Sequence, residues 1–195
     1  APRGGLSHAQ GGFMKPILTI AARGHLAATP GDAEAQTARP ADVASPEAVV
    51  EAAYAAITRR PGDPPDWDRF RSLFVPGAKM VPNAEQSEGE FRILTVDDFV
   101  EWIDGWTAET APIGSADDHG FAETQVHAEV ERYGDIALVM STYERTLWDD
   151  DEVLGRGVNG FQMVRAEDRW WIVGIVWDEE SGAGPVPERY LSEGR

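Results

Sequence analysis

Few polar side chains in this sequence combine a reactive group with a position that shields it from water. Glu144 and Thr142 form one such pair, because they continue the apolar alternation that starts at Ile136 in IALVMSTYERTLW. A carboxylate at the end of an apolar strand face loses hydration, which favours its protonated form and suits it to proton transfer. We therefore predict Glu144 as a catalytic acid or base and Thr142 as a substrate-binding residue. Arg145 and Arg156 offer the alternative, a plain ion pair with Glu144.

A second set of residues is expected to line a pocket. Asn159 and Gln162 fall in the largely apolar run VNGFQMVRAEDRWWIVGIVWDEE. There, each needs a hydrogen-bond partner, which is either protein or ligand. Trp67 and Trp177 are large, rigid side chains that suit either a cavity wall or an ordinary core. We predict that these four residues bind substrate, with a purely structural role as the alternative for each.

Metal and covalent chemistry find little support in the sequence. His119 and His127 share strand parity, but an extended chain separates them by roughly 26 Å, so they cannot hold one ion. The acidic run from Asp149 to Glu152 lacks the alternating spacing of a calcium-binding loop. The chain contains no cysteine, and its sequence has no glycine-rich phosphate loop and no nucleophile elbow. We expect neither a metal nor a cofactor.

Three helices are expected ahead of the sheet. SPEAVVEAAYAAITRR begins with Ser45 as the cap and Pro46 in the first helical position. DWDRFRSLF follows the cap Asp66, and TVDDFVEWIDGW opens with Thr95 and Asp98 in the spacing of a capping box. The segment AKMVP, which lies between the second and third helices, is expected to form a short strand.

From His119 onward the apolar period changes from 3.6 to 2, which predicts strands. The alternation places Glu123, Gln125, His127, Glu129 and Glu131 on a wet face of the first long strand. A hairpin turn is expected at 133–135 and a second at Glu167–Asp168. Pairing about the second turn places Val158, Gly160, Gln162, Val164, Trp171, Val173, Ile175 and Trp177 on one face. Because both faces of this hairpin are apolar, we expect helices on one side and a second subunit on the other.

The composition bounds the classes of partner. The chain has 195 residues, 42% of them hydrophobic, which suits one globular domain with a core. Its 34 acidic and 17 basic residues give a net charge of −17, which disfavours binding to nucleic acid or to an anionic membrane surface. No apolar run approaches the roughly 20 residues of a membrane-spanning helix.

Residues 1–44 are expected to form a flexible tail, since they are rich in alanine, glycine and proline and contain Phe13 as their only aromatic residue. The segment from Met14 has the order of a secretion signal, with Lys15 ahead of an apolar stretch. This stretch, Ile17 to Ala22, holds only six residues, fewer than the roughly 7–15 that are usual. We therefore predict a cytoplasmic protein, with export as the alternative.

The order of these elements resembles the nuclear transport factor 2-like superfamily, and within it the polyketide-cyclase (SnoaL-like) branch. The resemblance rests on DWDRFRSLF, YGDIALVMSTYE and RWWIVGIVW and covers about 45–191. It implies an α+β fold in which a curved antiparallel sheet packs on three N-terminal helices as a cone-shaped barrel. It also implies a pocket between helices and sheet, and frequent dimers through the outer sheet face.

Within that superfamily, ketosteroid isomerases carry a tyrosine on the first helix that donates to an oxyanion. The resemblance therefore implies a catalytic role for Tyr54, with a buried structural hydroxyl as the alternative. The isomerase base is an aspartate near the end of the first strand. Here, AKMVPN places Pro82 and Asn83 at that point, which counts against isomerase chemistry.

Two functional hypotheses follow. In the first, the domain 45–191 is a cofactor-free acid–base enzyme that acts on a small, mostly apolar cyclic molecule, with Glu144 and Tyr54 as its catalytic residues. In the second, it is a binding or dimerisation module without chemistry. A buried carboxylate that faces a ligand site favours the enzyme.

Overall fold

The structure is a computed structural model that describes residues 37–83 and 89–191. The helices within these ranges are η1 (Pro40–Val43), α1 (Pro46–Ile57), α2 (Trp67–Arg71), α3 (Val96–Thr110), α4 (Glu180–Ala183) and η2 (Glu188–Tyr190). The strands are β1 (Phe74–Val81), β2 (Ala122–Tyr133), β3 (Ile136–Thr146), β4 (Gly155–Ala166) and β5 (Arg169–Glu179). The three predicted helices and the two predicted hairpins are therefore present. Of the tail predicted for residues 1–44, residues 1–36 lie outside the described residues.

The helix starts follow the capping chemistry read from the sequence. The Ser45 hydroxyl accepts a hydrogen bond from the backbone amide of Ala48 at 3.2 Å, ahead of Pro46. Thr95 and Asp98 form a reciprocal capping box, with bonds of 2.9 and 3.1 Å. These bonds satisfy backbone donors that the first helical turn leaves without partners. The packed chain begins ahead of Ser45, since η1 already places Val43 in the core.

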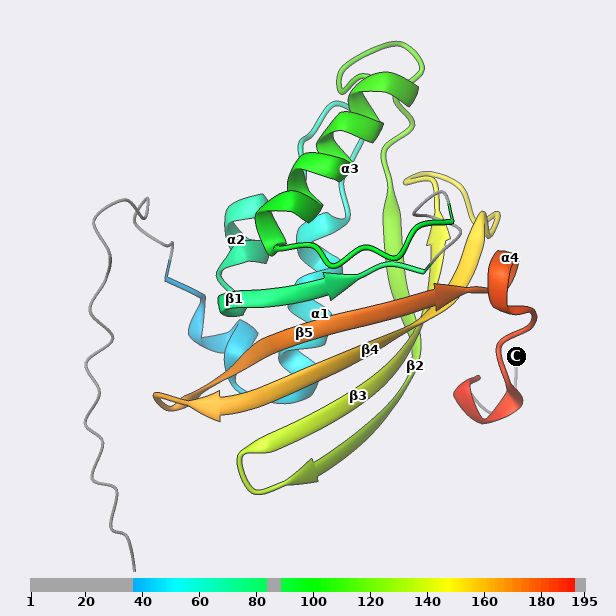
Figure 1. Ribbon diagram of the computed structural model, residues 1–195. Helices are drawn as coiled ribbons and strands as arrows, with labels where there is room; N and C mark the ends of the chain where they lie inside the picture. The colour runs from blue at the N-terminus through cyan, green and yellow to red at the C-terminus, as the bar shows by residue number, and fades with distance from the viewer. Residues whose placement is uncertain (1–36, 84–88, 192–195) are drawn as a thin grey trace, which may run out of the picture. The chain divides into compact units, whose positions relative to one another are not determined.

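The sheet has five strands in the order β1-β5-β4-β3-β2 (Figure 1). Neighbouring strands from β2 to β5 are antiparallel, whereas β1 runs parallel to β5. The sheet is therefore mixed, and it does not close into a barrel, since β1 and β2 are its edges. The α+β fold class expected from the sequence is confirmed.

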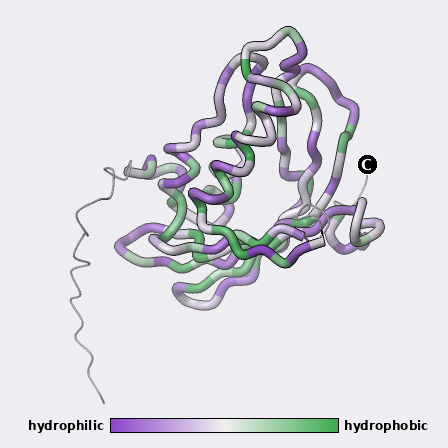
Figure 2. Tube along the Cα trace, turned by 45° about the horizontal axis from the view of Figure 1, so that its top comes forward, coloured by the Kyte–Doolittle hydropathy of each residue, from purple (hydrophilic) through white to green (hydrophobic). Residues whose placement is uncertain are grey.

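The sheet has two distinct faces, and α1 defines the inner one. This helix contacts β2, β3 and β5, and it lies across one side of the sheet in Figure 1. The inner face carries the buried side chains of β3 and β4, among them Val139, Tyr143, Phe161 and Met163. The outer face carries the other parity, and there Leu138 and Val176 are exposed. Hydrophobic and hydrophilic residues alternate along the strands in Figure 2, as expected for a sheet with unequal faces.

Two β-bulges change which side chains face the helices. The pairing of β2 with β3 shifts between Gln125 and His127, so that Val126 has no cross-strand partner. The pairing of β4 with β5 shifts at Gln162 and Met163, which leaves Val173 unpaired in the same way. An extra residue reverses the side-chain parity on one side of a bulge.

The face assignments predicted from strict alternation were therefore wrong at three positions that matter. Gln125 lies on the inner face because it pairs with Tyr143, and Glu123 lies on that face with it. Trp177 is the cross-strand partner of Asn159 and lies on the inner face, whereas the alternation had placed it on the same face as Gln162. The bulges thus bring two polar side chains and one indole into the space beneath the helices.

The C-terminal segment covers part of the outer face. Helix α4 contacts β4 and β5, and η2 contacts β2 and β3. The Thr142 hydroxyl donates to the carbonyl oxygen of Tyr190 at 2.5 Å, and Thr142 is fully buried as a result. Part of the apolar outer face, which the sequence assigned to a second subunit, is therefore covered by the chain itself.

A buried ion pair fixes the start of β2 against the end of α1. The Asp118 carboxylate accepts a hydrogen bond from the guanidinium of Arg59 at 2.7 Å. It also accepts from the backbone amides of Gly62, Gly114 and Gly120 at 2.7, 3.1 and 3.0 Å. Burial alone would raise the pKa of Asp118, but these four donors hold it well below its usual value. Thr58 extends this junction to β2, since its hydroxyl accepts from the amide of Glu123 at 3.1 Å.

Among the described residues, no helix is both long and apolar enough to cross a bilayer.

Candidate functional site

The structure places Glu144 and Tyr54 on opposite faces of the sheet. Glu144 lies on the outer face, where its carboxylate accepts from Arg156 at 3.1 Å (Nε) and 2.5 Å (Nη2). Both side chains are partly exposed, at 25% for Glu144 and 30% for Arg156. Arg156 also approaches Glu180 of α4 at 3.7 Å. The ion pair that the sequence offered as the alternative is therefore present, and the two predicted catalytic residues do not share a site.

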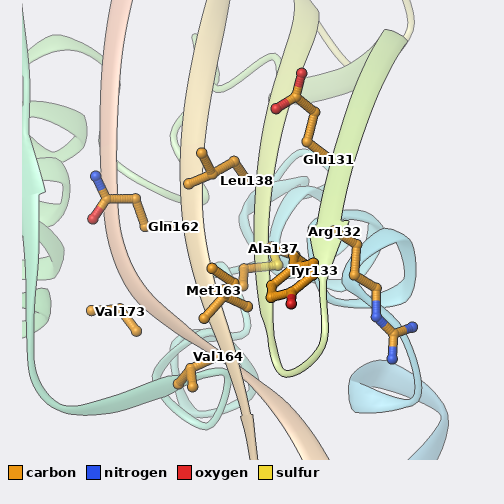
Figure 3. Close-up of a pocket in the computed structure, with 10 residues that line it drawn as sticks. Glu131, Arg132, Tyr133, Ala137, Leu138, Gln162, Met163, Val164 and Val173 are labelled. Atoms are coloured by element: carbon orange, nitrogen blue, oxygen red, sulfur yellow. The ribbon is translucent and has the colours of Figure 1, made fainter. Parts of the chain in front are cut away.

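Thr142 and Gln162 also belong to the outer face. The Thr142 hydroxyl is committed to Tyr190. Gln162 is exposed and lines an open cavity of about 430 Å³, together with Leu138, Val164 and Val173 (Figure 3). This cavity lies on the side of the sheet away from α1, so it is distinct from the pocket expected between helices and sheet.

Trp67 and Trp177 take part in one aromatic cluster on the helix side. Both rings contact Phe99 of α3 edge to face, with centroid distances of 6.4 Å for Trp67 and 5.8 Å for Trp177. The Trp67 indole donates to Asp104 at 2.7 Å, which ties α2 to α3. Edge-to-face contacts of this kind stabilise the packing of helices on a sheet. The cluster therefore holds α2 and α3 beside the inner face, and Trp177 reaches it from β5.

Tyr54 and Asn159 meet in a buried hydrogen-bond chain. The Asn159 side-chain nitrogen donates to the Tyr54 hydroxyl at 3.0 Å. That hydroxyl lies 2.8 Å from the hydroxyl of Ser141. The Ser141 hydroxyl in turn donates to the side-chain oxygen (Oε1) of Gln125 at 2.9 Å. Burial raises the pKa of the Tyr54 hydroxyl, and the nearby charge of Glu123 raises it further. Tyr54 is therefore a neutral hydrogen-bonding group at all ordinary pH values.

Glu123 is the most perturbed carboxyl of this inner-face cluster. Burial raises the pKa of Glu123 to about 8, against the opposing positive charge of Arg145. The negative charge of Glu179 raises this pKa further, whereas a hydrogen bond from Asn159 lowers it. Glu123 is therefore largely protonated at neutral pH and can exchange its proton near physiological conditions.

A second carboxylate, Glu179, lies near Glu123 but has different partners. It accepts from the Tyr143 hydroxyl at 2.9 Å and from the Arg145 guanidinium at 2.7 Å. Its side chain is 8% exposed. Burial raises the pKa of Tyr143, as do the charges of Glu123 and Glu179, so Tyr143 stays a hydrogen-bond donor. The site thus contains two carboxyls with different surroundings. Arg145 and Tyr143 hold Glu179, whereas burial favours the protonated form of Glu123.

Two glycines of β4 make room for this arrangement. A Cβ added at Gly157 would lie 2.6 Å from the Tyr143 hydroxyl and 2.5 Å from the carbonyl oxygen of Asp178. A Cβ added at Gly155 would lie 2.5 Å from the guanidinium of Arg145. Real Cβ atoms do not approach other heavy atoms so closely. The sequence GRG therefore lets Tyr143 and Arg145 lie flat over the β4 backbone and reach Glu179.

Sequence reasoning missed Glu123, Gln125, Tyr143 and Glu179. It assigned the first two to a wet face because strict alternation groups them with His127 and Glu129, and nothing in the local sequence marks the bulge at Val126. One available signal was the pair of glycines in GRG, since glycine inside a strand often marks a close approach of other atoms.

The described residues contain no cluster of histidine and carboxylate side chains that could hold a metal ion.

Comparison with known proteins finds likenesses among solved structures. No family model matches the sequence, and no curated protein matches it. The chain is similar in fold to NTF2-like proteins. One of the similar solved structures is an NTF2-like protein of unknown function from Silicibacter pomeroyi DSS-3. It is 24% identical, with a TM-score of 0.44 over 68% of this chain and 91% of that one.

Two further similar structures come from Nostoc punctiforme PCC 73102 and are described as having a cystatin-like fold and unknown function. The first is 11% identical, with a TM-score of 0.47 over 60% of this chain and 78% of that chain. The second is 14% identical, with a TM-score of 0.47 over 73% and 80%. At such identities the likeness concerns the fold, and function has to be argued from the site.

Proposed function

We propose that this chain binds a small, mostly apolar molecule on the inner face of the sheet and transfers a proton to or from it through Glu123. In this proposal Glu179, held by Arg145 and Tyr143, is the second carboxyl of the site beside Glu123. No cofactor takes part. The mechanism is general acid–base catalysis, in which a carboxyl is most effective when its pKa lies near the working pH.

The single observation that carries the proposal is the environment of Glu123. Its pKa of about 8 lies close to physiological pH, and the first cause of the shift is burial. Structural ion pairs usually move a carboxyl the other way, as the pKa of Asp118 shows. A carboxyl that is costly to ionise is a common feature of catalytic sites.

The partners of Glu123 fit this role. A hydrogen bond from Asn159 favours the charged form of its carboxyl. Arg145 attracts the charged form, so the proton can leave without stranding an isolated charge. On the same face Trp177 offers an apolar wall suited to a ring system.

The test compares two matched variants on a ligand taken from the cell. Protein purified gently from its own host is analysed by native mass spectrometry, and any bound small molecule is identified and then incubated with wild type, Glu123→Gln and Glu144→Gln. We expect turnover to fall at least about a hundredfold in Glu123→Gln, as is typical when a general acid or base is removed, with the ligand still bound. The sequence-based hypothesis predicts this loss for Glu144→Gln instead. Turnover that survives in Glu123→Gln disproves the role of Glu123.

A non-enzymatic binding module is the second candidate. It is favoured by the hydrogen-bond chain from Asn159 to Gln125, in which the polar groups satisfy one another without a substrate. In that case the bound molecule is recovered unchanged from wild type and from both variants. We propose a cytoplasmic location for the protein, whether it is an enzyme or a binding module.

We further propose that the chain forms a homodimer through the uncovered part of the outer face. Ile136, Leu138, Val173 and Val176 are exposed there, at 58%, 54%, 40% and 49%. A contiguous apolar surface of this kind is unfavourable in water and commonly marks a contact between subunits. The open cavity that Leu138 and Val173 line adds concave surface to the same region (Figure 3).

A further inference from the structure

The hydrogen-bond chain on the inner face has a fixed direction. The side-chain nitrogen of Asn159 can only donate, so the Tyr54 hydroxyl accepts at 3.0 Å. The Tyr54 proton is then directed at Ser141, 2.8 Å away. Ser141 uses its own proton toward the Gln125 carbonyl oxygen at 2.9 Å. Each hydroxyl therefore has one donor and one acceptor role filled, and Tyr54 has no second proton to offer a ligand.

The hydrogen-bond chain ends at Gln125, whose side-chain amide nitrogen is not used as a donor within it. The carbonyl oxygen of Gln125 is occupied by Ser141, which turns the amide nitrogen to the other side. Within the part of the chain that the structure describes, this nitrogen donates to no protein group. Gln125 is exposed, although it lies on the inner face with Tyr143 as its cross-strand partner. The two N–H bonds of the Gln125 side-chain amide therefore have a set orientation, and they lie at the solvent-accessible end of the hydrogen-bond chain.

Glu123 lies beside this amide. It precedes Gln125 by two residues on β2 and shares its face. At neutral pH its carboxyl carries a proton, because burial raises the pKa of Glu123 to about 8. Two carboxyls already share the charge of Arg145: Glu179, which it contacts at 2.7 Å, and Glu123, whose charged form it stabilises. The site therefore has no further cation for an anionic ligand. Two neutral donors side by side, in a chain with a net charge of −17, suit an uncharged acceptor better than a carboxylate or phosphate.

We propose that Gln125 determines the specificity of the inner-face site by donating a hydrogen bond from its amide to a carbonyl oxygen of the bound molecule. The substrate class is then a small cyclic ketone or a related carbonyl compound, with Glu123 within reach of the same group. Tyr54 and Ser141 act as positioning residues that hold the amide of Gln125 in its orientation. This inference rests on the proposed function, because it assumes that a small molecule binds beside Glu123.

The experiment uses two bicyclic probes that differ only in the carbonyl group, 1-tetralone and tetralin. Binding to the full chain is measured by tryptophan fluorescence, and the ratio of the two dissociation constants is the readout. We expect wild type to prefer 1-tetralone by about tenfold or more, because a site built to donate hydrogen bonds discriminates against a ligand that lacks the acceptor. Gln125→Glu keeps an oxygen that accepts from Ser141 but replaces the donor nitrogen. We expect this variant to lose the preference while it binds tetralin as before.

Two variants act as controls. Gln162→Glu makes the same change on the outer face, where Gln162 lines the other cavity, and we expect it to keep the preference. Gln125→Met removes both polar functions without adding a charge, and it should also lose the preference. Thermal unfolding establishes that each variant is folded.

Several outcomes would overturn the proposal. These are equal affinity of wild type for the two probes, binding of neither probe, and a preference that survives in both Gln125 variants. Loss of the preference in Gln162→Glu alone would locate carbonyl binding at the outer cavity and equally refute the role of Gln125. Failure of the proposed function is distinguishable, since turnover of the cellular ligand in Glu123→Gln is measured independently of these probes.

Discussion

At the scale of single residues, the protonation of Glu123 has a consequence for stability. Its pKa is about 8 in the folded chain against an ordinary value of 4.5. Between these values the folded protein holds a proton that the unfolded chain has released, so stability falls as the pH rises from about 4.5 to 8. Each pKa unit of difference corresponds to about 1.4 kcal/mol.

Glu123→Gln should remove this pH dependence, because an amide does not ionise. We expect the variant to match wild type near pH 5 and to exceed its free energy of unfolding by at least about 1 kcal/mol near pH 9. Urea unfolding at both pH values measures the difference. Glu144→Gln, which breaks a partly exposed ion pair, should cost no more than about 1 kcal/mol. A stability gap between wild type and Glu123→Gln that stays constant with pH would contradict the raised pKa.

Asp118 shows the opposite electrostatic behaviour. Its lowered pKa means that it stabilises the fold above its ordinary value of 3.8, and that this contribution is lost as the pH falls toward the folded pKa. Asp118→Ala leaves the buried Arg59 without a partner and three backbone amides without an acceptor. We expect a loss of about 3–5 kcal/mol at pH 7, measured by urea unfolding.

The matched control is Asp97→Asn. Asp97 pairs with Arg71 at the same distance of 2.7 Å, but its side chain is 80% exposed. Solvent screens such a pair, so the change should cost less than about 1 kcal/mol. Similar losses of unfolding free energy in Asp118→Ala and Asp97→Asn would mean that burial does not determine how much the Asp118 contacts stabilise the fold.

At the scale of the strands, the glycines of β4 are predicted to be irreplaceable. Gly157→Ala would push a methyl group against Tyr143 and the backbone of Asp178. We expect a loss of about 1–3 kcal/mol in the free energy of unfolding, since added groups in a packed region force side chains and backbone to shift. Gly105→Ala on α3 meets no atom within 4 Å and should stabilise the chain by about 0.5–1 kcal/mol. Melting temperatures of the two variants check both signs, and a Gly157→Ala variant as stable as wild type would refute the close approach.

Much of the element order could be predicted from local chemistry. Ser45, Thr95 and Asp98 mark helix starts that the structure confirms. The hairpin turn at Glu167–Asp168 is also confirmed, and both residues take positive φ, of 53° and 62°, which suits a tight two-residue turn. These features depend on a few neighbouring residues. For this reason a single sequence is enough to locate them.

The candidate site could not be predicted in the same way, because it depends on register. The bulge at Val126 decides whether Glu123 and Gln125 face water or the helices, and a one-residue shift moves every later side chain to the other face. The bulge at Val173 does the same for Trp177. The parallel pairing of β1 with β5 is likewise a contact between segments far apart in the chain. Asn159 was predicted correctly to need a buried partner, but Tyr54 and Glu123 became visible as those partners only in three dimensions.

At the scale of the whole molecule, the difference between the two sheet faces predicts a homodimer. The inner face holds the ionisable cluster, and the C-terminal segment covers the outer face around Thr142. The rest of the outer face stays apolar and exposed, with Leu138 at 54%. A second copy of the chain can bury this surface through a two-fold contact, in which each subunit uses the same patch. Dimerisation then needs only the sheet and leaves the inner-face site open.

Leu138→Lys should convert the proposed dimer to a monomer, because it places two like charges in the apolar centre of a two-fold contact. Sedimentation velocity measures the change in mass. Trp106→Lys is the control, since Trp106 is equally exposed at 54% but lies on α3, on the helix side; it should leave the dimer intact. A wild-type protein that sediments as a monomer would remove the dimer. It would also leave the exposed side chains around Leu138 to a different partner, while the chemistry proposed for Glu123 on the inner face would stand unchanged.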